Sequence, residues 1–206
     1  DTLNFIRKKC LVLDCDNTLW GGVVGEDGVD GIQLGDNYPG KAFIDLQKVI
    51  LELNATGVIL ALCSKNNEQD VLEVFKKNPN MVLKSKHISS QRINWNNKAD
   101  NILEISKELN IGLNSMVFVD DNPSEREIVK QLLPDVIVPD FPTKEYNLLN
   151  FIKELGSEYF SVFKLTNEDK NKSKQYLENT KRNESFSQFS DLNNYIKSLN
   201  INIELQ

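Results

Sequence analysis

Short, continuously apolar runs alternate along this chain with segments of helical periodicity. The apolar runs lie at 10–13, 58–63, 115–119 and 136–138. Between and after them, apolar residues recur every three or four positions, over about 42–53, 68–77, 99–109 and 123–133. A continuous apolar run is typical of a strand buried on both faces. Its alternation with helices predicts an α/β fold: a doubly wound, Rossmann-like parallel sheet with helices on both faces.

Two early segments lack this periodicity. Residues 21–35 hold six of the ten glycines, which predicts a loop or hairpin, and we expect a small glycine-rich flap at 19–38. Residues 78–97 are predicted to be irregular, apart from a short apolar run at 81–83. Only about 25 residues separate the first polar motif from the next helix, too few for a large cap domain. We therefore expect an open site.

The pattern changes to helices after residue 142. Three helices are expected there, at about 148–155, 166–182 and 192–199. The predicted organisation is an α/β core at 1–142, followed by a helical C-terminal extension at 143–206 that packs on the same domain.

Composition narrows the choice of partners. The chain has 206 residues, 40% of them hydrophobic and 26% charged, which suits one globular domain. A net charge of −6 argues against a nucleic-acid binder held by phosphate contacts. No apolar run approaches the roughly 20 residues needed to span a bilayer, so no membrane partner is expected. Three cysteines and no secretory signal predict a reducing, cytoplasmic location.

Polar residues follow three of the predicted strands, at 14–16, 64–67 and 120–122. The carboxyl ends of parallel strands meet at one edge of a sheet, where ligands bind. Four carboxylates are among these residues, and burying even one of them without a partner costs several kcal/mol. Oxygen ligands of this kind suit Mg²⁺, which we expect as the cofactor.

With a cation and a phosphate present, the polar side chains can be given roles. Asp14 could attack phosphorus to form an aspartyl-phosphate, and Asp16 could protonate the leaving group and later activate water. Ser64 could donate a hydrogen bond to phosphoryl oxygens, or it could simply cap the next helix. Lys98 lies where a helix is predicted to begin, and it either neutralises developing negative charge or merely opens that helix.

These residues resemble a known family. The run at 14–18 (DCDNT) resembles the first motif of the haloacid dehalogenase superfamily of phosphotransferases. Ser64, Lys98 and the pair Asp120 and Asp121 resemble its second, third and fourth motifs, in the right order. Further stretches look like the FkbH-like branch of that superfamily, at 12–28, 93–95, 118–126 and 166–169 with Tyr176.

The resemblance implies a specific activity. FkbH-like proteins take a three-carbon unit from 1,3-bisphosphoglycerate, remove phosphate and deliver a glyceryl group to the phosphopantetheine thiol of an acyl carrier protein. They serve polyketide biosynthesis, and some related domains are linked to a D-lactyl unit. By the same resemblance, Mg²⁺ would be held by Asp14, Asp121 and the backbone carbonyl of Asp16, with Asp120 acting from behind these ligands. Cys15 would carry the acyl group as a thioester.

The role of Cys15 has an equally weighted alternative, which is a small buried side chain. In a regular strand, Cys15 would point away from the face shared by Asp14 and Asp16. The two carboxylates would also disfavour the thiolate that nucleophilic attack requires.

Other polar or aromatic residues are expected to contact substrate: Thr18, Trp20, Lys65, Asn66, Asn122 and Arg126. Trp20 could instead belong to a structural hairpin, and Lys65 and Asn66 could be ordinary loop residues. Arg126 could pair with a residue one turn away on its own helix.

Three functions are therefore considered. The first is glyceryl transfer, favoured by an open site that suits a carrier-protein arm. The second is a plain Mg²⁺-dependent phosphatase acting on a small phosphorylated metabolite, in which Cys15 is inert. The third is a non-catalytic docking domain of a synthase, against which intact Asp14, Asp16 and Asp121 argue.

Overall fold

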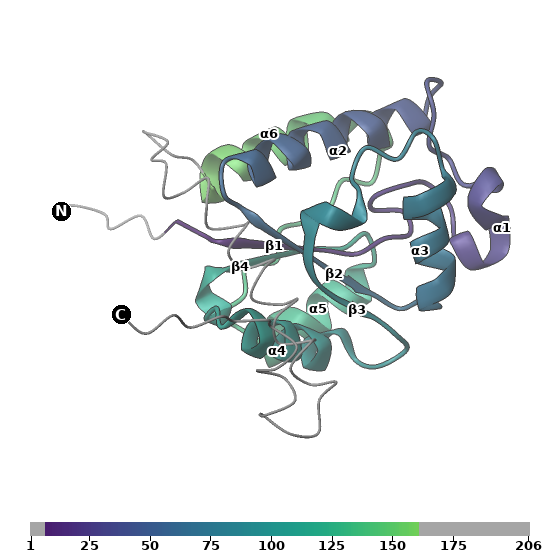
Figure 1. Ribbon diagram of the computed structural model, residues 1–206. Helices are drawn as coiled ribbons and strands as arrows, with labels where there is room; N and C mark the ends of the chain where they lie inside the picture. Colours follow the sequence, from purple (N-terminus) through teal and green to yellow (C-terminus); the bar gives the residue numbers. More distant parts are fainter. Residues whose placement is uncertain (1–6, 161–206) are drawn as a thin grey trace, which may run out of the picture.

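A parallel four-stranded sheet forms the centre of the molecule, seen here in a computed structural model that describes residues 7–160. Its strand order is β3-β2-β1-β4 (Figure 1). The strands are β1 (Cys10–Leu13), β2 (Ile59–Ser64), β3 (Ile88–Ile93) and β4 (Met116–Val119). The predicted parallel, doubly wound sheet is confirmed.

Helices cover both faces of the sheet. They are α1 (Val24–Gly31), α2 (Gly40–Ala55), α3 (Glu68–Lys77), α4 (Lys98–Leu109), α5 (Pro123–Leu132) and α6 (Leu148–Tyr159). Helices α2 and α6 lie on one face, and α4 and α5 on the other (Figure 1). Short 3-10 turns complete the chain, at Ser85–His87, Leu113–Ser115 and Glu145–Asn147.

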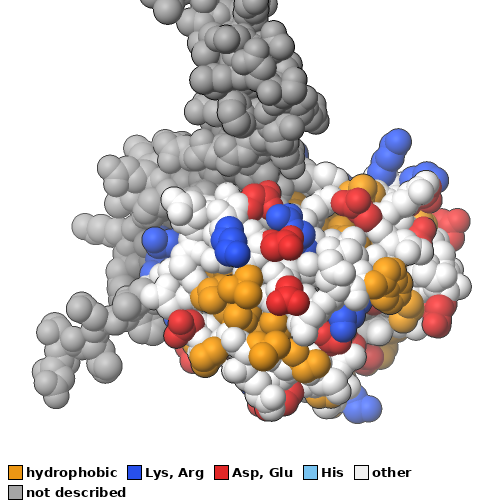
Figure 2. Space-filling model, turned by 90° about the horizontal axis from the view of Figure 1, so that it is seen from below, with side chains coloured by type: hydrophobic (Ala, Val, Ile, Leu, Met, Phe, Trp, Pro, Cys, Tyr) orange, Lys and Arg blue, Asp and Glu red, His pale blue; other side chains and the backbone are white. Residues whose placement is uncertain are grey.

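The core is divided in two by the sheet, and β1 contributes to both halves. Leu11 and Leu13 pack with the apolar faces of α2 and α6, whereas Cys10 and Val12 pack with those of α4 and α5. Burial on both faces explains why this strand is continuously apolar. Apolar side chains also reach the surface, as Figure 2 shows for the face seen from below. In α5, Ile128 and Leu132 are exposed.

The strand β3 was not predicted, because residues 78–97 were expected to be irregular. It lies at the edge of the sheet and pairs only with β2. Its side chains Ser90 and Arg92 bind Glu108 of α4 at 2.9 and 2.7 Å. These polar residues stand where a buried strand would usually have apolar ones. A strand stabilised by polar contacts with a neighbouring helix leaves no hydrophobic signature in the sequence.

The strand predicted at 136–138 is not formed; the segment makes only a single bridge to β4. Ile137 makes an isolated parallel bridge beside β4, accepting from Phe118 N at 2.8 Å and donating to Met116 O at 3.1 Å. Pro139 follows two residues later, and proline has no N–H to extend the ladder.

The glycine-rich segment at 19–38 is more ordered than the predicted flap. Helix α1 occupies its middle, with Gly28 at φ 69° inside it, a backbone conformation that favours glycine. Gly21 and Gln33 close the segment as an antiparallel bridge, so the expected hairpin is present only at its base. Among residues 7–160, no cap domain interrupts the α/β core.

Helix α6 lies within the predicted helical extension. The other two expected helices, at 166–182 and 192–199, fall outside the described residues, as does Tyr176. No helix in the described part of the chain is long and apolar enough to cross a bilayer.

A buried glutamine joins the first motif to the rest of the fold. Gln47 of α2 donates through Nε2 to Leu19 O at 2.7 Å. Its Oε1 accepts from the backbone amides of Val82 and Leu83 at 2.9 and 3.1 Å. This side chain therefore satisfies three backbone groups at once, which ties the segment after β1 to the segment before β3.

Replacing Gln47 with leucine should destabilise the protein by roughly 3 kcal/mol or more, because backbone groups would lose their partners inside the fold. Urea denaturation followed by circular dichroism measures the loss. Gln131→Leu is the matched control, since the Gln131 side chain bonds only Glu127 on the exposed face of α5. Equal stability of the two variants would contradict this reading of Gln47.

Candidate active site

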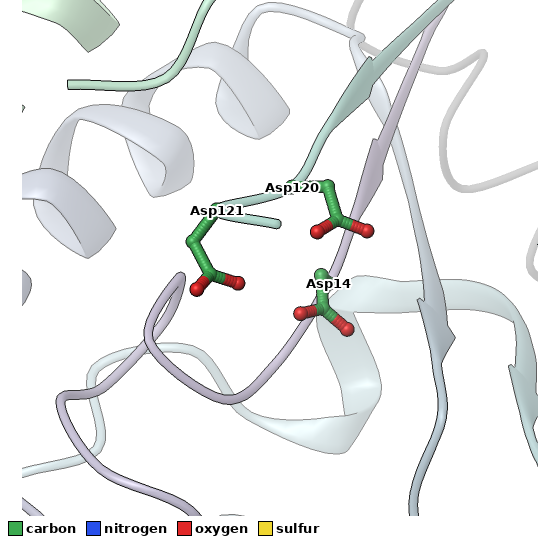
Figure 3. Close-up of side chains that lie close together, drawn as sticks. All are labelled: Asp14, Asp120 and Asp121. Carbon is green, nitrogen blue, oxygen red and sulfur yellow. The ribbon is translucent and has the colours of Figure 1, made fainter. Parts of the chain in front are cut away.

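Three aspartates from two strand ends meet at the carboxyl edge of the sheet. Asp14 follows β1, and Asp120 and Asp121 follow the adjacent strand β4. One carboxylate oxygen from each lies within 4.8 Å of the others. Figure 3 shows the three side chains converging on one space. The predicted convergence of the first and fourth motifs is therefore present.

A buried lysine joins this cluster from the opposite side. Lys98 is the first residue of α4 and is only 3% exposed. Its Nζ contacts Asp14 Oδ1 at 2.9 Å and Asp120 Oδ2 at 2.6 Å. Burial opposes the charge on Lys98, but the two carboxylates outweigh it and raise the pKa of the ammonium group. Lys98 therefore does more than open the helix, which Asn97 caps by accepting from Ala99 N.

Asp16 lies beside this cluster in a different environment. Its Oδ1 accepts from Trp20 Nε1 at 2.9 Å and from Val24 N at 3.0 Å, and its Oδ2 accepts from Asn66 Nδ2 at 2.7 Å. Burial nevertheless raises the pKa of Asp16, because it outweighs these hydrogen bonds. A carboxyl group with a raised pKa suits general acid catalysis. Sequence reasoning missed Val24, since a backbone donor leaves no side-chain signal.

Successive side chains of the loop between β2 and α3 have partners in different places. Asn66 reaches Asp16, whereas Lys65 forms an ion pair with Glu125 of α5 at 2.6 Å. Ser64 is buried next to Cys15 and within its hydrogen-bonding reach. It does not cap α3, whose N-cap residue is Asn67. Asn66 is thus placed at the site through Asp16, and Lys65 on its rim, whereas Ser64 is placed beside Cys15.

Trp20, predicted to contact substrate, is buried in the core beside the site. It is 0% exposed and its ring packs edge-on against Phe75. It acts on the site only through its hydrogen bond to Asp16. Thr18 is also buried, and its Oγ1 accepts from Asp121 N at 3.2 Å, so it holds two catalytic loops together.

Asn122 and Arg126, also predicted to contact substrate, organise the loop after β4. Asn122 caps α5, and its backbone amide donates to Asp120 Oδ1 at 2.8 Å. Arg126 Nη1 donates to the backbone carbonyls of Asp120 and Asp121. The alternative for Arg126, a partner one turn away on α5, is wrong, because its hydrogen-bond partners are these two loop carbonyls. Substrate contact by Asn122 and Arg126 stays a prediction.

Cys15 faces away from the carboxylate cluster. It is 0% exposed and packs with Leu11 and Leu13 on the α2 side of the sheet, as strand alternation requires. Burial and then the charge of Asp14 raise its pKa well above the ordinary value. An acyl carrier needs an accessible thiolate. The structure therefore favours the alternative of a small buried side chain.

Among solved structures, the chain is similar to the N-terminal part of the protein BF1531 from Bacteroides fragilis, which contains a phosphatase domain complexed with Mg. The two are 48% identical with a TM-score of 0.72. The match covers 76% of this chain and 41% of that one, so this chain spans less than half of the relative's length.

The chain has the haloacid dehalogenase fold. The contacts that join three of its motif-like segments, at Asp14, Lys98 and Asp120–Asp121, support membership of the superfamily.

Other solved structures are less similar. The haloacid dehalogenase domain of effector protein Lem4 from Legionella pneumophila is 11% identical, with a TM-score of 0.49, over 74% of this chain and 95% of that one. The 3-deoxy-D-manno-octulosonate 8-phosphate phosphatase from Moraxella catarrhalis is 17% identical, with a TM-score of 0.37, over 88% and 92%. Similarity this low supports no functional statement. No protein-family model and no curated protein matches the chain.

The charges of the carboxylate cluster fit a divalent cation. The cluster holds three carboxylates and one ammonium group, which contacts Asp14 and Asp120, so negative charge is left uncompensated. Burial, and then the charges of Asp14 and Asp120, raise the pKa of Asp121 to about 6. Burial, followed by the charge of Asp14, also raises the pKa of Asp120. Carboxylate oxygens are the ligands that Mg²⁺ prefers, so the donor set and its charge both suit this ion.

Magnesium binding should weaken below pH about 6, where protons compete for Asp121. Without metal, the contribution of Asp121 to stability should be full below its ordinary pKa of 3.8 and should be lost as the pH rises to about 6. Added Mg²⁺ should therefore raise the melting temperature more above pH 6 than below it. Thermal melts with and without Mg²⁺ test this, and Asp121→Asn should reduce the pH dependence, leaving the part that comes from Asp120 and Asp16. A magnesium effect that is the same on both sides of pH 6 would contradict it.

Proposed function

We propose that this protein is a Mg²⁺-dependent phosphatase that acts on a small phosphorylated metabolite through an aspartyl-phosphate on Asp14. The observation that carries the proposal is the cluster of Asp14, Asp120 and Asp121, in which the buried ammonium group of Lys98 contacts Asp14 and Asp120. The similarity to a Bacteroides fragilis protein with a phosphatase domain complexed with Mg supports it.

The proposed reaction has two displacements at phosphorus. A carboxylate oxygen of Asp14 forms a bond to phosphorus as the bond to the leaving oxygen breaks, and Asp16 gives its proton to that oxygen. Asp16 then takes a proton from water, whose oxygen attacks phosphorus and releases Asp14. Phosphate leaves, and both aspartates return to their starting states.

The surrounding residues stabilise charge during these steps. Lys98 is permanently charged between two carboxylates, and it would balance negative charge that develops on the transferred group. Ser64 would donate a hydrogen bond to a phosphoryl oxygen. Mg²⁺, held by Asp14, Asp121 and the backbone carbonyl of Asp16, would neutralise phosphoryl charge.

The narrower hypothesis is transfer of a glyceryl or D-lactyl unit from 1,3-bisphosphoglycerate to an acyl carrier protein. It rests on the resemblance of residues 12–28, 93–95 and 118–126 to the FkbH-like branch. The burial of Cys15 argues against an acyl group carried on this thiol. A non-catalytic docking domain would have no use for two buried carboxylates on a buried lysine, whose desolvation is costly.

Asp14→Asn should abolish Mg²⁺-dependent phosphate release, because an amide oxygen is a poor nucleophile. Asp16→Asn should slow it about 10²- to 10⁴-fold, the usual contribution of a general acid. Release of inorganic phosphate from acetyl phosphate and from a panel of phosphorylated metabolites measures both. Asp140→Asn is the control, since Asp140 is an exposed aspartate paired only with Lys130 on the surface. Full activity of Asp14→Asn would overturn the aspartyl-phosphate.

Cys15→Ala should leave phosphate release within about twofold of wild type, since the thiol touches no reacting group. Intact-protein mass spectrometry of the wild-type protein after incubation with 1,3-bisphosphoglycerate and Mg²⁺ should likewise detect no acyl adduct. An adduct that forms on the wild-type protein and disappears in Cys15→Ala would instead support the glyceryl transferase.

A further inference from the structure

Arg126 is placed unfavourably for its own helix. It lies in the first part of α5, which begins at Pro123, where the positive end of the helix dipole disfavours a cation. Its Nε is buried and has no hydrogen-bond partner in the described part of the chain. An unsatisfied buried donor lowers stability. Neither helix stability nor the satisfaction of its own donors explains the position of this guanidinium group.

The contacts that Arg126 does make all go to the loop after β4. Its Nη1 donates to Asp120 O at 2.9 Å and to Asp121 O at 2.7 Å. These two carbonyls belong to the residues whose carboxylates complete the cluster with Asp14. One charged donor therefore fixes two successive peptide groups of the predicted metal-binding loop, and hydrogen bonds to a charged donor are stronger than neutral ones.

The same loop is held by other contacts. Asp121 N donates to Thr18 Oγ1 at 3.2 Å, which links it to the loop after β1. Asn122 N donates to Asp120 Oδ1 at 2.8 Å, and Lys98 binds the other oxygen of that carboxylate. The Asp121 carboxylate has no such contact with Lys98 or Asn122, so its direction depends on the backbone to which it is attached.

We infer that Arg126 is a positioning residue for the magnesium site. By holding the carbonyls of Asp120 and Asp121, it fixes the backbone so that the Asp121 carboxylate faces Asp14 before metal arrives. Arg126 thus serves the site from its backbone side and does not bind the substrate. This inference rests on the proposed Mg²⁺-dependent function.

Calorimetric titration of the metal-free protein with MgCl₂ alone tests the inference without any substrate. Arg126→Ala should weaken magnesium binding about 10- to 100-fold, as is usual when a group that orients a ligand is removed. The magnesium affinity of Arg126→Lys should fall between those of the wild type and Arg126→Ala. The lysine ammonium group can still reach one carbonyl, but it cannot reproduce the planar fork of the guanidinium group. Lys130→Ala is the matched control on α5, since Lys130 only pairs with exposed Asp140.

Chemical rescue separates positioning from general destabilisation. Guanidinium ion at concentrations far below those that denature should restore magnesium affinity to Arg126→Ala and leave Lys130→Ala unchanged. Unchanged magnesium affinity in Arg126→Ala would overturn the inference. So would a loss of magnesium affinity that guanidinium does not reverse and that accompanies a lower melting temperature of the metal-free variant. If the wild-type protein releases phosphate and Arg126→Ala gives either of these outcomes, only the inference about Arg126 is refuted. A wild-type protein that neither binds Mg²⁺ nor releases phosphate refutes the proposed function as well.

Discussion

The contact of Lys98 with Asp14 and Asp120 is the interaction on which the rest of the site depends. It joins the first residue of α4 to the ends of the two neighbouring strands β1 and β4. Each charge is costly to bury alone, and a buried ion pair is stable only when its geometry is good. The strands must therefore pair in register and α4 must begin at Lys98 before any of these charges is tolerated.

Two aspartates separated by one residue acquire different properties from this arrangement. Asp14 contacts the ammonium group of Lys98, whereas Asp16 is bound by the neutral donors of Trp20, Val24 and Asn66. A carboxyl group with a raised pKa, as at Asp16, suits the acid role proposed for it. The difference arises from their partners, because the two side chains are chemically identical.

Much of the fold and of the candidate site could be predicted wherever a short stretch of sequence carries the pattern by itself. The continuous apolar runs at 10–13 and 58–63 indicated buried parallel strands, and the polar residues after them indicated the catalytic edge. The edge strand β3 gave no such signal, since its Ser90 and Arg92 are stabilised by glutamates of α4 that are distant in sequence. Residues 136–138 gave the signal of a strand but form a single bridge.

The sequence by itself determined the buried strands β1, β2 and β4, the helices that follow them and the convergence of Asp14, Asp16, Asp120 and Asp121 at one edge, because apolar periodicity and parallel topology suffice for these. It did not determine helix α1 or the edge strand β3. Only the tertiary structure decided what individual side chains do there. Cys15 and Trp20 are buried in the core, and Arg126 binds backbone carbonyls. The direction of a side chain and the partner it finds depend on packing between segments that are distant along the chain.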